Sequence, residues 1–487
     1  MAKQPMLKFV SIDRDMPEKR GADLRRQDFD EIYAEYAAEK AAEQASRCSQ
    51  CGVPYCQSHC PLHNNIPDWL RLTAEGRLQE AYQVSQATNT FPEICGRICP
   101  QDRLCEGNCV IEQSGHGTVT IGSVEKYITD TAWEQGWVAP IVPDHERVES
   151  VGIIGAGPGG LAAADVLRQA GVQVTVYDRY DRAGGLLTYG IPGFKLEKDV
   201  VMRRVEQLEK SGVTFVQDCD VDADIFATIR AEHDAVIIAT GVYKSRDLEI
   251  PGNGAAGVIK AIDYLTASNR VGFGDSVAEY EDGTLNAEGK RVVVIGGGDT
   301  AMDCVRTAIR QGASSVKCLY RRDRANMPGS QREVANAEEE GVVFEWLSAP
   351  KAFVSDLQAT DAGGDAGCVT GVRVQKMRLG APDASGRQSP EVIEGADYTE
   401  DADIVVKALG FEPEELPTLW DQPELTVTRW GTIRAEFESG ATALPGVYAV
   451  GDIVRGASLV VWAIRDGRDC AQAVLRDLSA PGAVAAE

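Results

Sequence analysis

Short apolar runs alternate with glycine-rich turns and amphipathic stretches along most of this chain. The runs 151–154 and 172–177 flank a helical pattern that extends to Ala170, and the runs 292–295 and 316–320 flank a second helical pattern. Short apolar runs that alternate with helices predict strands of a parallel sheet. Each copy also closes on a similar apolar run, at 235–241 and 403–410. The pattern therefore predicts a strand–helix–strand unit that occurs twice, about 140 residues apart.

The other periodic stretches predict elements around this duplicated unit. Phe29, Ile32, Tyr33 and Tyr36 recur at helical spacing and predict an amphipathic helix over 25–46. A helical segment with Pro67 near its start lies between two cysteine runs, and residues 138–149 are typical of a linker. Further predictions are turns between short strands over 359–398, a strand ending at Gly451–Asp452, and a helix over 457–475.

Composition limits the classes of function. The 487 residues include 49 Lys and Arg against 74 Asp and Glu, a formal charge of −25, which argues against a nucleic-acid binder. The chain is 44% hydrophobic and 25% charged, as expected for a globular protein. No apolar run reaches membrane-spanning length, and no secretory signal precedes Asp15. We therefore expect a cytoplasmic protein with no membrane association.

Two glycine loops predict two dinucleotide sites. Each follows a predicted strand and opens a predicted helix, which is the context that confirms such a motif. The glycines allow close approach of the backbone to pyrophosphate, and the helix N-terminus supplies N–H donors. The candidate residues are Gly155, Gly157, Pro158, Gly159 and Gly160 in the first loop, and Gly296, Gly298, Asp299, Thr300 and Ala301 in the second.

The residues that end the second strand of each unit distinguish the two nucleotides. Asp178 follows Gly155 by 23 positions, and a carboxylate there binds ribose hydroxyls and repels a 2′-phosphate, as suits FAD or NAD. Arg321 and Arg322 occupy the matching place in the second unit and predict a site for NADPH, although a solvated charge pair is the alternative. We assign the first site to FAD, with further candidates at Gly185, Leu186, Thr240, Gly241, Gly451 and Asp452.

Eight of the 13 cysteines lie between Cys48 and Cys109, which favours metal or redox chemistry over disulfides. Two four-cysteine runs suit two [4Fe–4S] clusters, and in two-cluster ferredoxins the fourth cysteine of a run binds the other cluster. One predicted set is Cys48, Cys51, Cys56 and Cys109, and the other is Cys60, Cys95, Cys99 and Cys105. Two structural zinc ions are the alternative. His59 and His63 are interpreted as incidental, Glu125 as a surface or helix residue, and the five scattered cysteines as buried.

These observations predict the fold class and a direction of electron flow. We expect an α/β protein with two Rossmann-like domains of glutathione-reductase type, the first of them discontinuous, after a helical iron–sulfur domain. The expected boundaries are 1–145, 146–255, 256–409 and 410–487, the last completing the FAD domain. The segment 184–194 lacks the redox cysteine pair of disulfide reductases, so we expect electrons to leave through the clusters. A flavin links hydride chemistry to one-electron carriers, and direct hydride transfer needs no catalytic side chain.

The cysteine runs and the segments 151–161, 184–196, 296–303, 320–328 and 451–452 resemble the small (β) subunits of bacterial NADPH-dependent glutamate synthases over nearly the whole chain. Relatives include the N-terminal half of dihydropyrimidine dehydrogenase. The resemblance implies an electron-input subunit that oxidises NADPH, reduces FAD and passes electrons through two [4Fe–4S] clusters. The implied partner is a large (α) subunit that carries FMN and a glutaminase site, in a hetero-oligomer that makes glutamate from glutamine and 2-oxoglutarate.

Two rival hypotheses remain open at this point. The same module in a stand-alone or differently partnered protein would reduce ferredoxin or another acceptor, and its site residues would be the same. A noncatalytic scaffold is the second rival, but it has no use for two intact glycine loops and an arginine pair.

Overall fold

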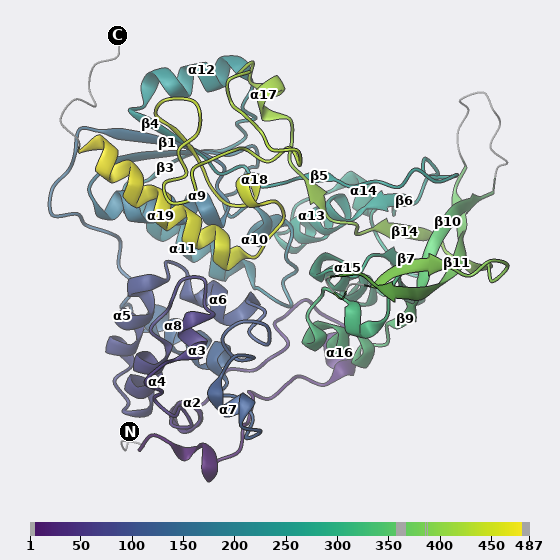
Figure 1. Cartoon of the computed structure of the whole chain (residues 1–487), viewed down its shortest axis with the longest axis horizontal. Helices are drawn as coiled ribbons and strands as arrows, with labels where there is room; N and C mark the ends of the chain where they lie inside the picture. The colour runs from purple at the N-terminus through teal and green to yellow at the C-terminus, as the bar shows by residue number, and fades with distance from the viewer. Residues whose placement is uncertain (1–4, 357–366, 385, 387, 480–487) are drawn as a thin grey trace.

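A helical N-terminal domain and two parallel sheets covered by helices make up the molecule (Figure 1). The computed structural model describes residues 5–356, 367–384, 386 and 388–479. The predicted duplication is present, because each parallel sheet has five strands in the equivalent spatial order. We call the two α/β parts the first and second units.

Short helices build the N-terminal domain around a core that includes Trp69, Leu70 and Val124. Helix α4 begins beside Pro67, as predicted. After the short α1 (Ala22–Arg25), its helices are α2 (Ala38–Ala45), α3 (Tyr55–Ser58), α4 (Ile66–Ala74), α5 (Leu78–Thr88), α6 (Pro92–Ile98), α7 (Val110–Gln113) and α8 (Ile121–Glu134). Residues 138–149 contain no helix or strand and connect this domain to the first unit, also as predicted.

The predicted helix over 25–46 is wrong for most of its length, because only α1 and α2 are helical there. The intervening chain is not helical, and its apolar side chains contact separate partners. Phe29 packs 6.2 Å from the Phe194 ring, whereas the Tyr36 hydroxyl donates a hydrogen bond to the Thr120 hydroxyl. Tyr33 forms an isolated antiparallel bridge with Lys19. Tertiary contacts of this kind override local helix propensity.

The first unit is a parallel sheet in the order β16-β4-β1-β2-β3. Its strands are β1 (Ser150–Ile154), β2 (Gln173–Tyr177), β3 (Thr214–Val216), β4 (Ala235–Ile238) and β16 (Val447–Ala449). Its helices are α9 (Pro158–Gln169), α10 (Leu186–Tyr189), α11 (Lys198–Lys210), α12 (Ala223–Glu232), α17 (Leu416–Leu419), α18 (Asp452–Arg455) and α19 (Val460–Leu478). Because β16 returns from the far end of the chain, this unit is discontinuous.

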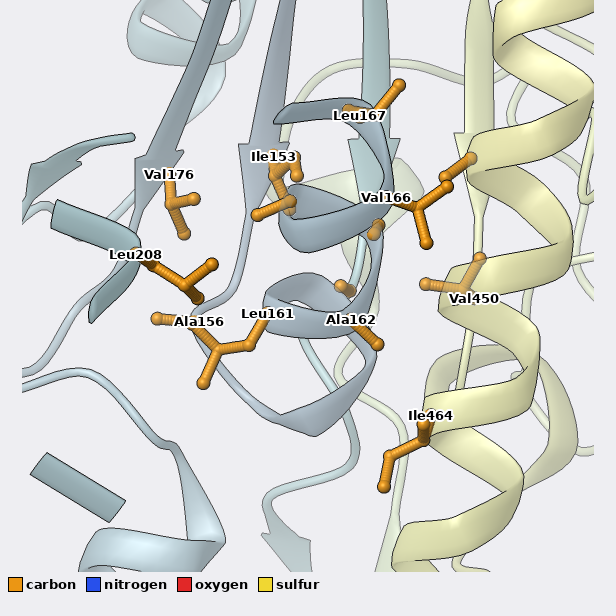
Figure 2. Close-up of a cluster of buried hydrophobic side chains, with 14 of the residues drawn as sticks. Ile153, Ala156, Leu161, Ala162, Val166, Leu167, Val176, Leu208, Val450 and Ile464 are labelled. Carbon is orange, nitrogen blue, oxygen red and sulfur yellow. The ribbon is translucent and has the colours of Figure 1, made fainter. Parts of the chain in front are cut away.

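Helix α9 lies between the first sheet and α19 and anchors the core of this unit. Figure 2 shows Ala162 and Val166 of α9 on the side that faces Val450 and Ile464, and all four belong to the same buried cluster. A Cβ added at Gly467 of α19 would lie 2.1 Å from the Gly159 carbonyl oxygen, so the two helices touch at these glycines. This contact holds α19 against the start of α9.

The second unit is a parallel sheet in the order β6-β14-β7-β8-β9. Its strands are β6 (Val258–Lys260), β7 (Arg291–Ile295), β8 (Ser315–Tyr320), β9 (Val343–Trp346) and β14 (Ile404–Lys407). Its helices are α13 (Ala261–Gly272), α14 (Ala278–Glu281), α15 (Asp299–Arg310) and α16 (Gln331–Glu339). The strands β5 (Lys244–Ser245) and β15 (Phe411–Glu412) pair where the chain passes between the two units.

An antiparallel sheet extends the second unit, with β10 (Ser348–Ser355) and β12 (Gln388–Val392) on either side of β11 (Val369–Pro382), which also pairs with β13 (Tyr398–Asp401). The prediction of short strands over 359–398 is wrong for β11, which is 14 residues long. Residues 359–366, 385 and 387 of that stretch lie outside the described residues.

Of the five scattered cysteines, Cys304, Cys318 and Cys470 are buried as predicted. The prediction is wrong for Cys219, which is half-buried, and for Cys368, which is exposed beside the antiparallel sheet. Among the described residues, no helix combines the length and the apolar character that crossing a membrane requires.

Candidate functional site

The first glycine loop connects β1 to α9, and its glycines serve two different purposes. A Cβ at Gly155, which has φ +109°, would lie 2.4 Å from the Ala239 carbonyl oxygen, and one at Gly160 would lie 2.0 Å from the Gly155 oxygen. The chain's own packing therefore requires both. At Gly157 an added Cβ would meet nothing within 4 Å, and the backbone is in the ordinary extended region. Glycine at this position leaves space for a ligand against the uncapped start of α9.

Ten predicted residues of the first site line one cavity of about 350 Å³. They are Gly155, Gly157, Pro158, Gly159, Asp178, Leu186, Thr240, Gly241, Gly451 and Asp452. Gly160 and Gly185 are not in the lining. Gly160 packs behind the loop, and a Cβ at Gly185, which has φ +54°, would lie 2.9 Å from the Gly157 Cα. Gly185 therefore supports the loop from outside the cavity.

The polar groups of this cavity fit a nucleotide. Burial raises the pKa of Asp178, whose carboxylate accepts hydrogen bonds from the N–H groups of Ala156 (2.6 Å) and Tyr180 (2.9 Å). Thr240 has a buried hydroxyl with no hydrogen-bond partner in the described structure. Burial also raises the pKa of Asp452 to about 6. An unpaired buried hydroxyl is costly, so a bound ligand with polar atoms would satisfy it.

Sequence analysis missed an aromatic wall on this cavity. Tyr180 and Tyr243 line it with ring centroids 6.1 Å apart, and the Arg179 guanidinium lies 5.7 Å from the Tyr243 ring. Arg179 is held by Glu414, 2.6 Å away, which belongs to the C-terminal part of the chain. The position of Arg179 and Tyr180 directly after Asp178 was a usable signal, whereas Tyr243 and Glu414 reach the cavity only through the fold.

The second glycine loop repeats this construction. Gly296 is required by packing, because a Cβ there would lie 2.2 Å from the Ala408 carbonyl oxygen, whereas one at Gly298 would meet nothing within 4 Å. Helix α15 starts at Asp299 without a side-chain cap, followed by Thr300 and the buried Ala301. The Gly329 N–H donates to the Gly297 oxygen at 2.9 Å, so the segment after β8 crosses the loop.

Arg321 and Arg322 follow β8 at the edge of the second sheet beside this loop. Arg321 is exposed, and the Arg322 guanidinium lies 5.9 Å from the Tyr320 ring. Neither guanidinium forms an ion pair with any residue that the structure describes. Tyr320 itself packs on the loop, since a Cβ at Gly297 would lie 2.4 Å from its ring. Two unpaired guanidinium groups beside a phosphate-type loop fit a 2′-phosphate.

The first predicted cysteine set comes together in the N-terminal domain. Cys48, Cys51, Cys56 and Cys109 line one small cavity, although Cys109 is more than fifty positions from the others. Burial raises the pKa of the Cys48 thiol to about 11 and that of Cys56 to about 12. A metal centre that binds thiolates would compensate for this burial and release the protons.

The second predicted set lies around α6, which contains Cys95 and is followed directly by Cys99. A hydrogen bond with Cys95 is the largest cause of the raised pKa of the half-buried Cys99 thiol, and the charge of Cys60 raises this pKa further. Burial raises the pKa of the Cys105 thiol, and Cys60 contributes there too. His59 is exposed, and its ring Nδ1 lies 2.9 Å from the backbone carbonyl oxygen of Tyr55.

Glu125 was expected at the surface or on a helix, and only the helix is right. It lies on α8 and is buried, and its Oε1 accepts hydrogen bonds from Asn64, Ser85 and Asn89. Burial raises its pKa to about 8, and its charge contributes to the raised pKa values of Cys99 and Cys105. This carboxyl is therefore a neighbour of the second cysteine set that the sequence did not reveal.

The three parts of the molecule meet at a second cavity of about 510 Å³. The N-terminal domain contributes Cys99, and the second unit contributes Asp299 and Thr300. Leu186 and residues 458–460, at the start of α19, line both this cavity and the first one. The two glycine-loop sites and the second cysteine set therefore open toward a common junction.

Comparison with known proteins assigns these parts to known families. Residues 25–137 match the family described as dihydropyrimidine dehydrogenase domain II, 4Fe-4S cluster, and residues 149–467 match pyridine nucleotide-disulphide oxidoreductases. The glutamate synthase [NADPH] small chain of Azospirillum brasilense is 64% identical over 100% of both chains. The chain belongs to the glutamate synthase [NADPH] small-chain family. The glutamate synthase [NADPH] small chain of Escherichia coli is 43% identical to this chain, over 97% of this chain and 98% of the E. coli chain.

Family membership resolves two of the alternatives left open by the sequence. A glutamate synthase small chain is an NADPH-dependent oxidoreductase with iron–sulfur and flavin oxidoreductase domains, so the zinc alternative and the scaffold hypothesis are set aside. Its cofactors are FAD, NADPH and [4Fe–4S] iron–sulfur centres. The putative oxidoreductase AegA of E. coli is 46% identical to this chain, over 95% of this chain and 69% of AegA.

Solved structures agree on the fold. FprA from Mycobacterium tuberculosis in complex with NADPH superposes with a TM-score of 0.55 at 20% identity, covering 68% of this chain and 85% of FprA. This likeness confirms the α/β architecture of the two units.

Proposed function

We propose that this chain is the electron-input subunit of a glutamate synthase, with the roles of its parts as follows. The first unit (146–255 and 410–487) holds FAD, the second (256–409) holds NADPH, and the N-terminal domain (1–145) holds two [4Fe–4S] clusters. The partner is a large subunit with FMN and a glutaminase site that makes L-glutamate from L-glutamine and 2-oxoglutarate. The observation that carries this proposal is the common junction between both nucleotide sites and the second cysteine set.

The residues of this chain would bind and orient FAD and NADPH and shield them from water. Gly157 and the start of α9 would hold the FAD pyrophosphate, with Asp178 at the ribose and Asp452 beside α19. Gly298 and α15 would hold the NADPH pyrophosphate, and Arg321 and Arg322 its 2′-phosphate. When bound, FAD supplies the exchange between hydride and single-electron chemistry. No side chain acts as an acid or base in that step, so we assign no catalytic residue.

The cluster ligands follow from the two cysteine sets. We assign Cys48, Cys51, Cys56 and Cys109 to one cluster, supported by their common cavity. We assign Cys60, Cys95, Cys99 and Cys105 to the other, which lies toward the nucleotide junction because Cys99 lines it. The first cluster is then the one farther along the path from the flavin.

The composition of the surface over the first cysteine set is typical of an interface with a permanent partner. Residues 48–67 contain no Asp, Glu, Lys or Arg, although a quarter of the chain is charged. Val53 and Tyr55 are 64% and 50% exposed there. Interface cores are depleted of charge and enriched in aromatic residues, whereas transient partners are steered by charge. We therefore place the large subunit over this surface.

Removing these apolar groups is expected to weaken the complex without affecting the nucleotide sites. In the double variant Val53→Ser/Tyr55→Ser, we expect the affinity for the large subunit, measured by anaerobic titration, to fall at least tenfold, consistent with loss of interface anchors. NADPH-dependent dye reduction stays unchanged. Val142→Ser, which removes an exposed valine from the linker, is the control. Unchanged affinity of the double variant would place the large subunit elsewhere.

The isolated chain tests the proposed function without the partner. Purified anaerobically, it is expected to contain FAD and iron–sulfur clusters, to lose its flavin absorbance on addition of NADPH, and to reduce an artificial dye. It forms no glutamate from glutamine and 2-oxoglutarate. A chain with bound flavin that NADPH does not bleach would refute the assignment.

A further inference from the structure

The segment 184–198 connects the first cavity to the second unit. Neither nucleotide site accounts for the contacts of its residues Phe194 and Lys195. It includes Leu186, which lines the first cavity, and it ends at Lys198, the first residue of α11. Eight residues beyond Leu186, the Phe194 ring is buried against the second unit. Disulfide reductases carry a redox cysteine pair in this region, and this chain has none there. The segment is therefore free to serve another purpose.

Phe194 is held between two arginines of α15. The guanidinium of Arg310 lies 3.9 Å from the ring centroid and that of Arg306 lies 4.5 Å from it. Both arginines are fixed by the fully buried Glu340, whose carboxylate also accepts a hydrogen bond from Arg25 of the N-terminal domain at 3.1 Å. Cation–π contacts are stronger where the groups are withdrawn from water, as they are here. The Phe194 ring thus joins the first unit to α15.

Lys195 makes the neighbouring contact with the same face of α15. Its Nζ lies 2.9 Å from Asp303 Oδ1 and 3.9 Å from Glu333 Oε2, and its side chain is 16% exposed. Asp303, Arg306 and Arg310 follow Asp299 at intervals of three or four residues, so they lie on one helical face. Lys198 stabilises the fold of the segment itself, because its Nζ donates hydrogen bonds to the carbonyl oxygens of Leu187 and Ile191.

The same helix begins at the second glycine loop. Because α15 is a continuous helix of twelve residues, contacts on its body fix the direction of its N-terminus, where the NADPH pyrophosphate site lies. Lys195, Asp299, Thr300 and Asp303 all line the junction cavity. A small error in this direction would move the nicotinamide end of a bound dinucleotide away from the first cavity.

We propose that Phe194 and Lys195 are positioning residues that lock α15 to the first unit and so align NADPH for hydride transfer. They touch no reacting atom, and they act through the orientation of the second unit. The proposal rests on the proposed function, since it assumes that NADPH binds at the second glycine loop and FAD at the first.

The test compares Lys195→Met with Lys317→Met. Lys317 also forms an ion pair with a glutamate, at 2.6 Å from Glu400, but lies within the second unit. For Lys195→Met we expect flavin bleaching by NADPH, followed by stopped flow, to slow at least tenfold, because misplacement by about 1 Å costs up to about 100-fold. The affinity for NADP⁺ is expected to stay within threefold of wild type. Lys195→Arg, which keeps the positive charge, is expected to retain most of the wild-type bleaching rate. Lys317→Met is expected to bleach at the wild-type rate.

A measurement without NADPH separates alignment from catalysis. Amide hydrogen exchange in residues 184–198 and 299–310 is expected to be faster in Lys195→Met than in the wild type or in Lys317→Met. The charge-reversed pair Lys195→Asp/Asp303→Lys should recover part of the bleaching rate that either single variant loses. Wild-type rates in folded Lys195→Met, or unchanged exchange, would overturn the proposal. A wild-type chain that NADPH does not bleach would instead overturn the proposed function.

Discussion

Replacing both Arg321 and Arg322 by alanine is expected to abolish the preference for NADPH over NADH. Each hydrogen bond between a guanidinium and a phosphate contributes about 1.5–3 kcal/mol, and 1.4 kcal/mol corresponds to a tenfold change in affinity. The double variant should therefore bind NADP⁺ at least 100-fold more weakly. Binding of NAD⁺, which lacks the 2′-phosphate, should change less than about threefold. Calorimetric titration with each oxidised nucleotide measures both.

Arg324→Ala is the matched control for this prediction. Arg324 lies in the same segment and is 45% exposed, but its guanidinium is paired with Glu338 at 2.8 Å. Its removal should leave both affinities unchanged. If NADP⁺ bound the folded double variant as tightly as the wild type, Arg321 and Arg322 would be a solvated charge pair and the 2′-phosphate would bind elsewhere.

Removing one ligand of the first cysteine set is expected to stop electron delivery while NADPH oxidation at the flavin continues. In Cys51→Ala the cluster of Cys48, Cys56 and Cys109 loses a thiolate, so the iron content should fall by about half, as expected if two clusters are present. Flavin bleaching by NADPH should keep the wild-type rate. NADPH oxidation that depends on the large subunit should fall at least 100-fold, since one-electron carriers complete the path.

Two further variants check the ligand assignment. Cys368→Ser changes an exposed cysteine far from the clusters and should leave the iron content unchanged. Cys95→Ala should lose the second cluster, whereas Glu125→Gln should keep it, because we assign the fourth ligand to Cys95. Retention of four-iron clusters in Cys95→Ala, with their loss in Glu125→Gln, would move that ligand to the buried carboxyl of Glu125.

The sequence predicts the features that are encoded locally. Each glycine loop follows an apolar run and opens a helix, so the chain order alone places Gly157 before α9 and Gly298 before α15. The duplication made the parallel sheets predictable, and the return of the chain at Gly451 indicated that the first unit is discontinuous. Arg321 and Arg322 were recognisable for the same reason, because they directly follow a strand.

Features that depend on contacts between distant segments were not predictable. The segment after Arg25 has helical periodicity, but Phe29 packs on Phe194 and Tyr36 on Thr120, so the chain between α1 and α2 is not helical. Glu125 has the sequence environment of an ordinary helix residue, and only the packing of α8 against α5 and α6 buries it. The wall at Tyr243 and Glu414 likewise forms only when the C-terminal segment returns to the first sheet.

The most direct test of the central claim is NADPH oxidation by this chain assembled anaerobically with its large subunit. The account predicts that NADPH oxidation without a dye requires both glutamine and 2-oxoglutarate, and that two molecules of glutamate form for each NADPH consumed. Omitting either substrate, or the large chain, should stop it. NADPH oxidation that instead needs only ferredoxin, with no glutamate formed in the presence of the large chain, would contradict the assignment.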